Sequence, residues 1–479
     1  MNVPSFEFLI FAAVGALAFR VAPSAFWRLL VLAGINGVFF LSQSHGLVSI
    51  VPYAAFVVVS YGFVAGLQAF PDQRRTLAPV FVLLTLLGFV WLKKYGFFPS
   101  FVLIRDVYVV IGLSYVFFRV LQLVIDVGAG VVDARVGPLT YFNYAMNFTT
   151  LVSGPIQRFQ DYSRQQSAPE GVTLPVFGHS LERIAKGMFK VFVLSALLRQ
   201  LQTHELAHMS EVQSPLAHIV CGALIAVSYP LFLYCNFSGY TDVVIGCARW
   251  FGMALPENFR NPFWSDNFIN FWGRWHITLS NWLKTYVYNT LLMRLMSRFP
   301  ARSAEPYFAV LAFFVTFFLV GVWHGQTSEF VAFGALQGGG VAANKLYQIF
   351  AVRWLGKSGY KSLCANRLYK GLTRGMTFAW FAFTLFWFWG SWRDLEQLWT
   401  TFGPAEIAII FALVMVASAA VIELVREAYE AGGRFQIGGV VVLQSKYVRT
   451  VQVSLLLMAT VCMILLSNSP APDIVYKTF

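Results

Sequence analysis

Charged side chains and cysteines are scarce in this chain of 479 residues. Asp, Glu, Lys and Arg together make up 12% of it, about half of the ~25% that is usual in soluble domains. This scarcity excludes an ordinary soluble enzyme and a disordered chain, because both keep a much larger charged fraction. The cysteines number five and form no Cys-x-x-Cys pair, which argues against a disulfide framework and a structural zinc site.

Apolar residues instead account for 58% of the chain, and they gather in long runs. A transmembrane helix needs ~20 such residues. We therefore predict an all-α polytopic integral membrane protein with roughly eleven transmembrane helices, folded as a single membrane domain over residues 1–479. Several runs are short, so we expect re-entrant or interfacial helices among them. The runs lie near residues 4–19, 26–42, 46–69, 77–92, 107–125, 138–156, 187–199, 216–237, 306–323, 326–350, 373–392, 404–424 and 450–467.

The net charge of +13 predicts membrane topology rather than a nucleic-acid partner, because Lys and Arg accumulate in the cytoplasmic loops of membrane proteins. No basic residue precedes the first run, whereas Arg20 and Arg28 follow it. This pattern places the N-terminus on the extracytoplasmic face. Residues 249–302 carry seven basic and two acidic residues, which predicts a cytoplasmic location for this segment.

Four tryptophans are interleaved with these charges, at positions 264, 272, 275 and 282. Trp and basic residues together are typical of a helix in the headgroup layer. The spacing of Trp272, Trp275, His276, Leu279 and Trp282 predicts one continuous amphipathic helix with these residues on one face. Aromatic packing is the main alternative to a functional role for the tryptophans.

Polar residues inside apolar runs are costly and mark candidate sites. Arg119, Gln122 and Asp126 share one helical face, where a buried ion pair or hydrogen-bond ladder between helices is the structural alternative. Residues 153–155, Ser-Gly-Pro, end another run and predict a re-entrant turn beside a tunnel.

His324 lies in a Gly-Val-Trp-His-Gly motif near the end of an apolar run. A buried neutral imidazole can accept a proton near pH 7, which suits a general base. We expect Gly321 and Gly325 to let a substrate approach closely. From the residues alone, a structural histidine stays the alternative.

A second pattern, His204-Glu-x-x-His208, fits a zinc-binding helix. It lies in a polar stretch, 199–214, rather than in an apolar run, and no further ligand motif follows on a later run. We therefore predict no metal site.

Several short motifs occur in a fixed order and together resemble the membrane-bound O-acyltransferase (MBOAT) family. The resemblance is closest to a bacterial branch that contains alginate O-acetylation membrane proteins and teichoic-acid D-alanyl transferases. The motifs are Gly-Leu-Ser-Tyr at 112–115, Ser-Gly-Pro-Ile at 153–156, Phe-Ser-Gly-Tyr-Thr-Asp at 237–242, Leu-Pro-Glu-Asn-Phe at 255–259, Phe-Trp-Gly-Arg-Trp-His-Ile-Thr-Leu-Ser at 271–280 and Gly-Val-Trp-His-Gly at 321–325.

The resemblance implies a helical bundle around a central tunnel, with core motifs over 112–325 and C-terminal helices over 326–470. It implies that His324 is the catalytic residue and that His276 is a second site residue, for donor positioning or for structure. The motif positions that we expect to contact substrates are Asp242, Asn258, Trp275, Ser280 and Trp323.

The resemblance also implies an enzyme of a bacterial cytoplasmic (inner) membrane without a bound cofactor. The donor would be a cytoplasmic thioester, acyl-CoA or an acyl carrier. The acceptor would be a hydroxyl of an extracytoplasmic glycan or envelope polymer, reached directly or through a periplasmic acetyltransferase partner, and membrane lipid would surround the protein.

Two alternatives stay open. After Tyr288, residues 289–294 depart from the alginate-type pattern and are closer to the teichoic-acid branch, which would transfer D-alanine from a carrier protein. A non-catalytic transporter or scaffold would also explain polar residues such as Arg119 and Asp126 inside apolar runs.

Overall fold

The computed structural model describes residues 1, 3–44, 46–95, 101, 103–104, 108–301, 303–434, 436–437, 440–441 and 445–467. These residues form two compact units. The first holds Met1–Val191 and Phe237–Pro256, and the second holds Phe192–Asn236 and the described residues from Glu257 onward. The single domain over 1–479 stays a prediction. Arg302, in the basic segment, and residues 468–470, at the end of the expected C-terminal helices, lie outside the described residues.

The first unit is built from short and medium helices. Its elements are α1 (Phe6–Val21), α2 (Ala25–Leu41), α3 (Val51–Ala69), α4 (Arg74–Leu92), α5 (Leu113–Gly128), α6 (Pro138–Ala145), α7 (Phe159–Ser167) and α8 (Leu174–Phe189).

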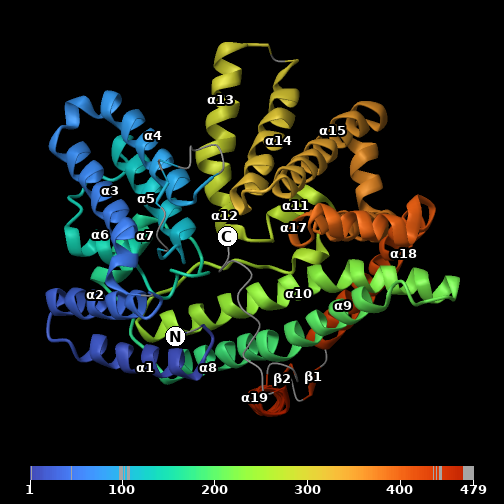
Figure 1. Cartoon of the computed structure of the whole chain (residues 1–479), viewed down its shortest axis with the longest axis horizontal. Helices are drawn as coiled ribbons and strands as arrows, with labels where there is room; N and C mark the ends of the chain where they lie inside the picture. The colour runs from blue at the N-terminus through green and yellow to red at the C-terminus, as the bar shows by residue number, and fades with distance from the viewer. Residues whose placement is uncertain are drawn as a thin grey trace. The chain divides into compact units, whose positions relative to one another are not determined.

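The second unit combines the long helices α15 (Ser328–Ala365) and α18 (Trp392–Arg434) with several short ones (Figure 1). Helix α10 (Pro215–Trp250) contributes its first part to this unit. The other helices are α9 (Ala196–His208), α11 (Phe268–Trp272), α12 (Ile277–Leu283), α13 (Asn289–Arg298), α14 (Glu305–His324), α16 (Arg367–Thr384), α17 (Phe386–Trp389) and α19 (Lys446–Ser467). Strands β1 (Gln436–Ile437) and β2 (Val440–Val441) form an antiparallel pair.

Six described helical segments are long and apolar enough to cross a membrane. They are Val48–Ala69, Pro71–Leu92, Pro215–Trp250, Glu305–His324, Trp392–Arg434 and Lys446–Ser467. Helix α2 is apolar but shorter. The predicted class, a helical chain with several candidate membrane spans, is confirmed, whereas the expected number of about eleven spans stays a prediction.

Helix α1 shows why the chain needs an apolar solvent. Its buried face is apolar, and its exposed face is apolar as well. Water would disfavour an exposed stripe of this kind, and lipid tails accept it. The exposed stripe consists of Phe6, Ile10, Val14, Leu17 and Val21.

The run predicted over 138–156 is only partly helical. Helix α6 ends at Ala145, and the buried backbone that follows is irregular up to Arg158. Arg119 of α5 stabilises this break, because its guanidinium donates to the carbonyl oxygens of Tyr144, Ala145 and Thr150 at 2.7–2.9 Å. Residues 153–155 are non-helical, as predicted, and Arg119 binds backbone carbonyls of the preceding segment. A re-entrant turn beside a tunnel stays a prediction.

Candidate functional site

His324 is the last residue of α14 and is 4% exposed. Gly325 follows it in an extended conformation and ends the helix. The imidazole ring lies among aromatic rings, with centroid distances of 4.6 Å to Trp323, 5.0 Å to Phe388 of α17 and 6.1 Å to Phe333 of α15. The ring is therefore held at a helix end inside an apolar shell.

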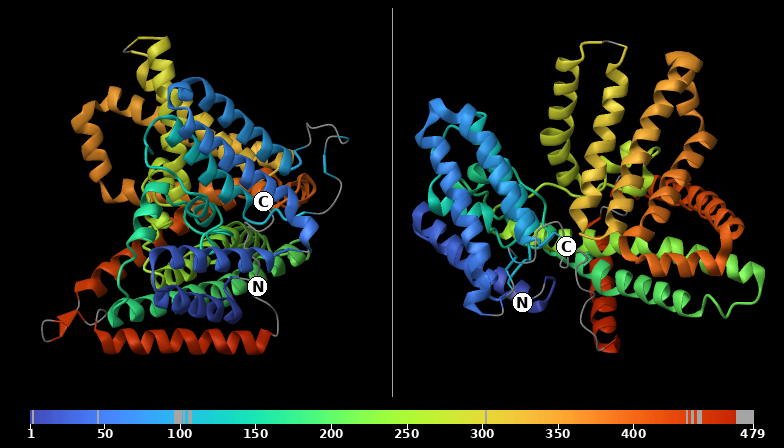
Figure 2. Two further views of the ribbon diagram at one scale, coloured as in Figure 1. Left: turned by 90° about the vertical axis from the view of Figure 1, so that its left-hand side faces the viewer. Right: turned by 45° about the horizontal axis from the view of Figure 1, so that its top comes forward.

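The glycines around His324 serve helix packing. A Cβ atom at Gly321 would lie 2.2 Å from the Cα of Gly334, and a Cβ at Gly325 would lie 2.1 Å from the ring of Phe330. Helices α14 and α15 therefore approach closely at these glycines, near the turn that joins them (Figure 2). The expectation that these two glycines leave space for a substrate is wrong, because α15 already occupies that space.

His276 lies in a break between two short helices. Helix α11 ends at Trp272, and α12 begins at Ile277 with His276 as its N-terminal cap. The φ angle of His276 is 43°, a left-handed conformation that few non-glycine residues adopt. The predicted continuous amphipathic helix is therefore wrong at this point. The residue is buried at this point, with 1% of its surface exposed.

Burial also determines the charge of His276. It lowers the pKa of the imidazole from 6.5 to about 3, because desolvation penalises the charged form. The ring is therefore neutral near pH 7. A neutral imidazole can serve as a hydrogen-bond partner for a bound thioester or for the protein.

Asn258 ties this turn to the preceding loop. Its side-chain oxygen accepts hydrogen bonds from the backbone nitrogen of Thr278 at 3.2 Å and from the Thr278 hydroxyl at 2.6 Å. Its backbone oxygen accepts from the nitrogen of Ile277 at 2.9 Å, and the nitrogen of Arg260 donates to the carbonyl of Arg274 at 3.0 Å. These bonds flank His276 on both sides and hold its unusual conformation.

The other motif residues of this turn pack within the second unit. Trp275 is buried against aromatic rings, with centroid distances of 5.1 Å to Phe259 and 5.0 Å to Phe381 of α16. The hydroxyl of Ser280 donates to the carbonyl oxygen of Trp275 at 3.3 Å. These contacts give Trp275 and Ser280 a structural role, and their contact with substrate stays a prediction.

Asp242 lies in the first unit, on the second part of α10. Its carboxylate pairs with Arg183 at 3.0 Å and Lys190 at 2.7 Å. Nearby, α8 and α10 approach closely at Gly187 and Gly239, where a Cβ atom would lie 2.6–2.7 Å from a facing backbone oxygen. The ion pairs explain Asp242 as a link between neighbouring helical segments, and a role in substrate binding stays a prediction.

The predicted site residues thus fall into three groups. Asn258, Trp275, His276 and Ser280 build one hydrogen-bonded turn, Trp323 and His324 build the end of α14, and Asp242 belongs to the first unit. The structure explains how each group is held, and their catalytic and binding roles stay predictions.

The His204-Glu-x-x-His208 pattern lies on α9. The Nδ1 atom of His208 shares a hydrogen bond with the backbone carbonyl of His204 at 2.8 Å, and the two rings are 4.4 Å apart. Across the described ranges, no group of three or more His, Cys, Asp or Glu side chains is arranged to hold a metal ion.

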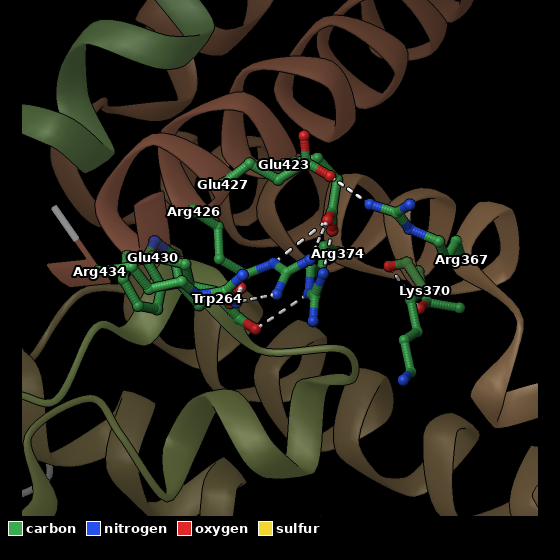
Figure 3. Close-up of polar contacts among 10 residues, drawn as sticks. Trp264, Arg367, Lys370, Arg374, Glu423, Arg426, Glu427, Glu430 and Arg434 are labelled. Carbon is green, nitrogen blue, oxygen red and sulfur yellow. Dashed lines mark hydrogen bonds and ion pairs between the residues drawn. The ribbon is translucent and has the colours of Figure 1, made fainter. Parts of the chain in front are cut away.

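A charged cluster between α16 and α18 was not foreseen (Figure 3). Arg374 of α16 pairs with Glu423 of α18, which also binds Arg426 at 2.9 Å. The Arg374 Nε atom donates to the backbone carbonyl of Trp264 at 3.2 Å. This contact secures the loop that begins at Asn258. A detectable signal was the spacing of charges at 423, 426, 427, 430 and 434, which follows i,i+3 and i,i+4 pairs.

Comparison with known proteins adds an independent line of evidence. The chain is 29% identical over 308 residues to a probable alginate O-acetylase of Pseudomonas syringae pv. tomato, covering 60% of this chain and 56% of that protein. It is 26% identical over 285 residues to a teichoic acid D-alanyltransferase of Bacillus subtilis, covering 59% of this chain and 69% of that protein. It is 28% identical over 216 residues to a peptidoglycan O-acetyltransferase of Helicobacter pylori, covering 44% of this chain and 38% of that protein.

These alignments leave much of each relative uncovered. The chain spans a little over half the length of the alginate proteins that it matches. The sequence pattern of the membrane-bound O-acyltransferase family, in contrast, matches residues 63–388 of the chain. That range includes the turn at His276 and the end of α14 at His324. The chain therefore belongs to the membrane-bound O-acyltransferase (MBOAT) family.

Proposed function

We propose that this protein transfers an acyl group, with acetyl preferred, from a cytoplasmic thioester to a hydroxyl of an extracytoplasmic polysaccharide or envelope polymer. Transfer is direct or passes through a partner protein in the periplasm. The donor is acyl-CoA or an acyl-carrier thioester. The protein acts in a bacterial inner membrane, as one bundle of about eleven membrane helices around a tunnel. The observation that carries this proposal is the buried imidazole of His324 at the end of α14 in a chain of this family.

The chemistry follows from this position. His324 accepts the proton of the acceptor hydroxyl while the oxygen attacks the thioester carbonyl carbon. The C–O bond forms, the C–S bond breaks, and the imidazolium returns its proton to the leaving thiolate. A thioester is reactive enough for this direct transfer, so the step needs no Ser or Cys nucleophile. A positioned base of this kind contributes ~10²–10⁴-fold to the rate.

The helix end supports a base at this position. The last carbonyl groups of a helix carry a partial negative charge, which stabilises a cation placed there. His324 is the last residue of α14, so the helix stabilises the imidazolium that forms during transfer. The apolar shell of Phe333 and Phe388 limits the access of water, which would otherwise compete with the acceptor hydroxyl.

His276 serves the donor side in this proposal. Its turn contains Arg274 and belongs to the basic segment, which faces the cytoplasm. The neutral imidazole positions the thioester, and Asn258 holds the turn through Ile277 and Thr278. Trp275, Ser280, Trp323 and Asp242 are assigned to the surroundings of the substrates.

A transfer assay tests the proposal directly. Membranes that contain the protein are given labelled acetyl-CoA or a D-alanyl carrier protein, together with candidate glycan acceptors. We expect label in the acceptor from the acetyl donor and none in a His324→Gln variant. Transfer in neither case would leave a transporter or scaffold as the better explanation, and equal transfer by the variant would reject His324 as the base.

D-alanyl transfer to teichoic acid is the second candidate. It is supported by the similarity to the teichoic acid D-alanyltransferase of Bacillus subtilis and by the departure at residues 289–294. Label transferred only from the D-alanyl carrier protein would favour it over acetyl transfer.

Cysteine labelling tests the orientation. Ser297 is exposed on α13, at the end of the basic segment. In a background without the five native cysteines, a Ser297→Cys variant should react with a membrane-permeant thiol reagent. It should not react with an impermeant reagent in intact cells. Labelling by the impermeant reagent would reverse the proposed topology.

A further inference from the structure

A cavity of about 480 Å³ lies in the second unit between α15, α16 and the residues that precede α11. One part of its lining is apolar and includes Phe268, Met376 and Trp380. Another part is polar and includes Asp266 and Lys370. A cavity with both kinds of wall fits an amphiphilic molecule.

The chain around this cavity is strongly basic. Residues 345–374 contain seven Lys and Arg residues and no Asp or Glu. Three of them are used within the protein, since Arg367 pairs with Glu427, Arg374 pairs with Glu423, and Arg353 donates to the Tyr307 hydroxyl at 2.8 Å. Lys370 lies between Arg367 and Arg374 on α16, yet its side chain points away from the carboxylates of α18 (Figure 3). In the described part of the chain, no hydrogen bond or ion pair engages its ammonium group.

The hydrogen-bonding groups of the cavity favour a ligand that accepts hydrogen bonds. The Oδ1 atom of Asp266 already accepts from the side-chain amides of Asn267 at 3.0 Å and Asn270 at 2.8 Å. The Oδ1 atom of Asn344 accepts from the nitrogen of Ile269 at 3.3 Å. These bonds use the Asn344 oxygen and one of the two carboxylate oxygens of Asp266.

Donors, in contrast, stay available. Among the residues that the structure describes, the buried indole N–H of Trp380 has no hydrogen-bond partner. The hydroxyls of Tyr347 and Tyr369 share one hydrogen bond of 2.9 Å, which leaves one of their two hydrogens free to donate. With the Lys370 ammonium, these groups supply a positive charge and several donors, which match a phosphate group.

We propose that this cavity binds the phosphate headgroup of an anionic phospholipid. The phosphate lies at Lys370, and an acyl chain follows the wall formed by Phe268, Met376 and Trp380. Basic pockets between membrane helices are suited to such headgroups. The site is separate from the proposed acyl transfer and does not depend on it.

The surface next to the cavity supports a lipid rather than a soluble phosphate compound. The second half of α15 exposes Trp354 at 87% and Phe350 at 54% beside its basic residues. Large apolar and basic side chains together are typical of a helix at the headgroup layer. In this proposal the cavity therefore opens at the headgroup layer.

The test uses the purified full-length protein in neutral micelles. Phosphatidylglycerol or phosphatidylcholine is added, and the retained lipid is counted by native mass spectrometry beside the melting temperature. We expect preferential retention of phosphatidylglycerol. Lys370→Gln should weaken it about fivefold, since one basic residue near a charged headgroup contributes ~1 kcal/mol.

Three further variants give the test its controls. Gly339→Leu keeps Lys370 but fills the cavity, because a Cβ at Gly339 has no neighbour within 4 Å, and it should also reduce retention. Asp266→Asn should increase retention, because it removes a negative charge from the wall. Lys357→Gln loses the same charge from an exposed position outside the cavity, and it should retain phosphatidylglycerol as the wild type does.

Two outcomes would overturn the proposal. Equal losses in Lys370→Gln and Lys357→Gln, or equal retention of the two lipids, would show attraction by net charge alone. An equal rise in melting temperature with glycerol phosphate, which has no acyl chain, would reject the lipid assignment. Melting in phosphatidylcholine micelles verifies that each variant is folded.

Discussion

His324 and His276 are both buried, at 4% and 1% exposed, yet the protein holds them by different means. His324 ends a long apolar helix whose position depends on close packing against α15 at Gly321 and Gly334. His276 lies in a short turn whose conformation depends on hydrogen bonds that Asn258 accepts from Thr278. The first region is stabilised by close helix packing and the second by hydrogen bonds.

This difference predicts which substitutions destabilise each region. Packing between helices fails when volume is added, because the backbones must separate. A hydrogen-bonded turn fails when a partner is removed, because buried polar groups are left unsatisfied. Substitutions chosen on this basis separate the roles of the two histidines.

The largest effect is expected at His324. A His324→Gln variant keeps most of the side-chain volume but cannot act as a base at neutral pH. We expect acyl transfer to fall by at least ~100-fold, with a melting temperature close to that of the wild type. Transfer rates in membranes and melting curves of purified protein measure both. Activity above about a tenth of the wild-type level would reject the general-base role.

The second effect concerns packing at Gly321. Gly321→Ala places a methyl group 2.2 Å from the Cα of Gly334, so α14 and α15 must separate. We expect a loss of about 1–3 kcal/mol in unfolding free energy and reduced transfer, because His324 lies one turn further along. Gly339→Ala on α15 is the matched control: its Cβ enters open space, so stability should be unchanged or slightly higher. Similar losses in both variants would contradict the packing argument.

The third effect concerns the turn at His276. Asn258→Ala leaves the Thr278 nitrogen and hydroxyl without their acceptor, which should cost about 1–2 kcal/mol. We also expect weaker apparent donor affinity, because the turn loses its conformation. Asn270→Ala, an exposed change on α11, should alter stability by less than ~0.5 kcal/mol. A donor titration beside melting curves checks these effects. Unchanged stability and donor affinity in Asn258→Ala would show that the turn keeps its conformation without the Asn258 side chain.

The smallest effect is a pH dependence at His276. Its folded-state pKa of about 3 lies below the ordinary 6.5, so the unfolded chain binds a proton that the native state does not. Stability is therefore complete above about pH 6.5 and falls as the pH falls toward 3. A His276→Asn variant should lose less stability than the wild type between pH 7 and 5.5, by about 1 kcal/mol. Identical acid profiles would show that His276 is not buried in the folded protein.

Activity in the same variant decides between the two roles of His276. If the residue positions the donor, His276→Asn should weaken donor use while His324→Gln blocks transfer. An unchanged apparent donor affinity and maximal rate in a folded His276→Asn protein would remove His276 from the site.

The sequence alone determined the membrane class and the position of most apolar helices. The run at 306–323 became α14, and the runs at 26–42 and 450–467 became α2 and α19 within a few residues. Hydrophobic length and composition decide these helices locally, because a backbone in lipid must satisfy its hydrogen bonds within the segment. The ordered motifs also indicated the family.

Only the tertiary structure decided how the candidate site is held. Helical spacing predicted one continuous face through His276. Instead, a hydrogen bond that the Asn258 carbonyl accepts from Ile277 helps to hold His276 in a left-handed conformation. The glycines beside His324 suggested that a substrate could approach closely, but Gly334 and Phe330 fill that space. Arg119 looked like a partner for a carboxylate, but it binds carbonyls at the end of α6. Each of these outcomes depends on contacts between different segments of the chain, and local sequence patterns do not predict such contacts.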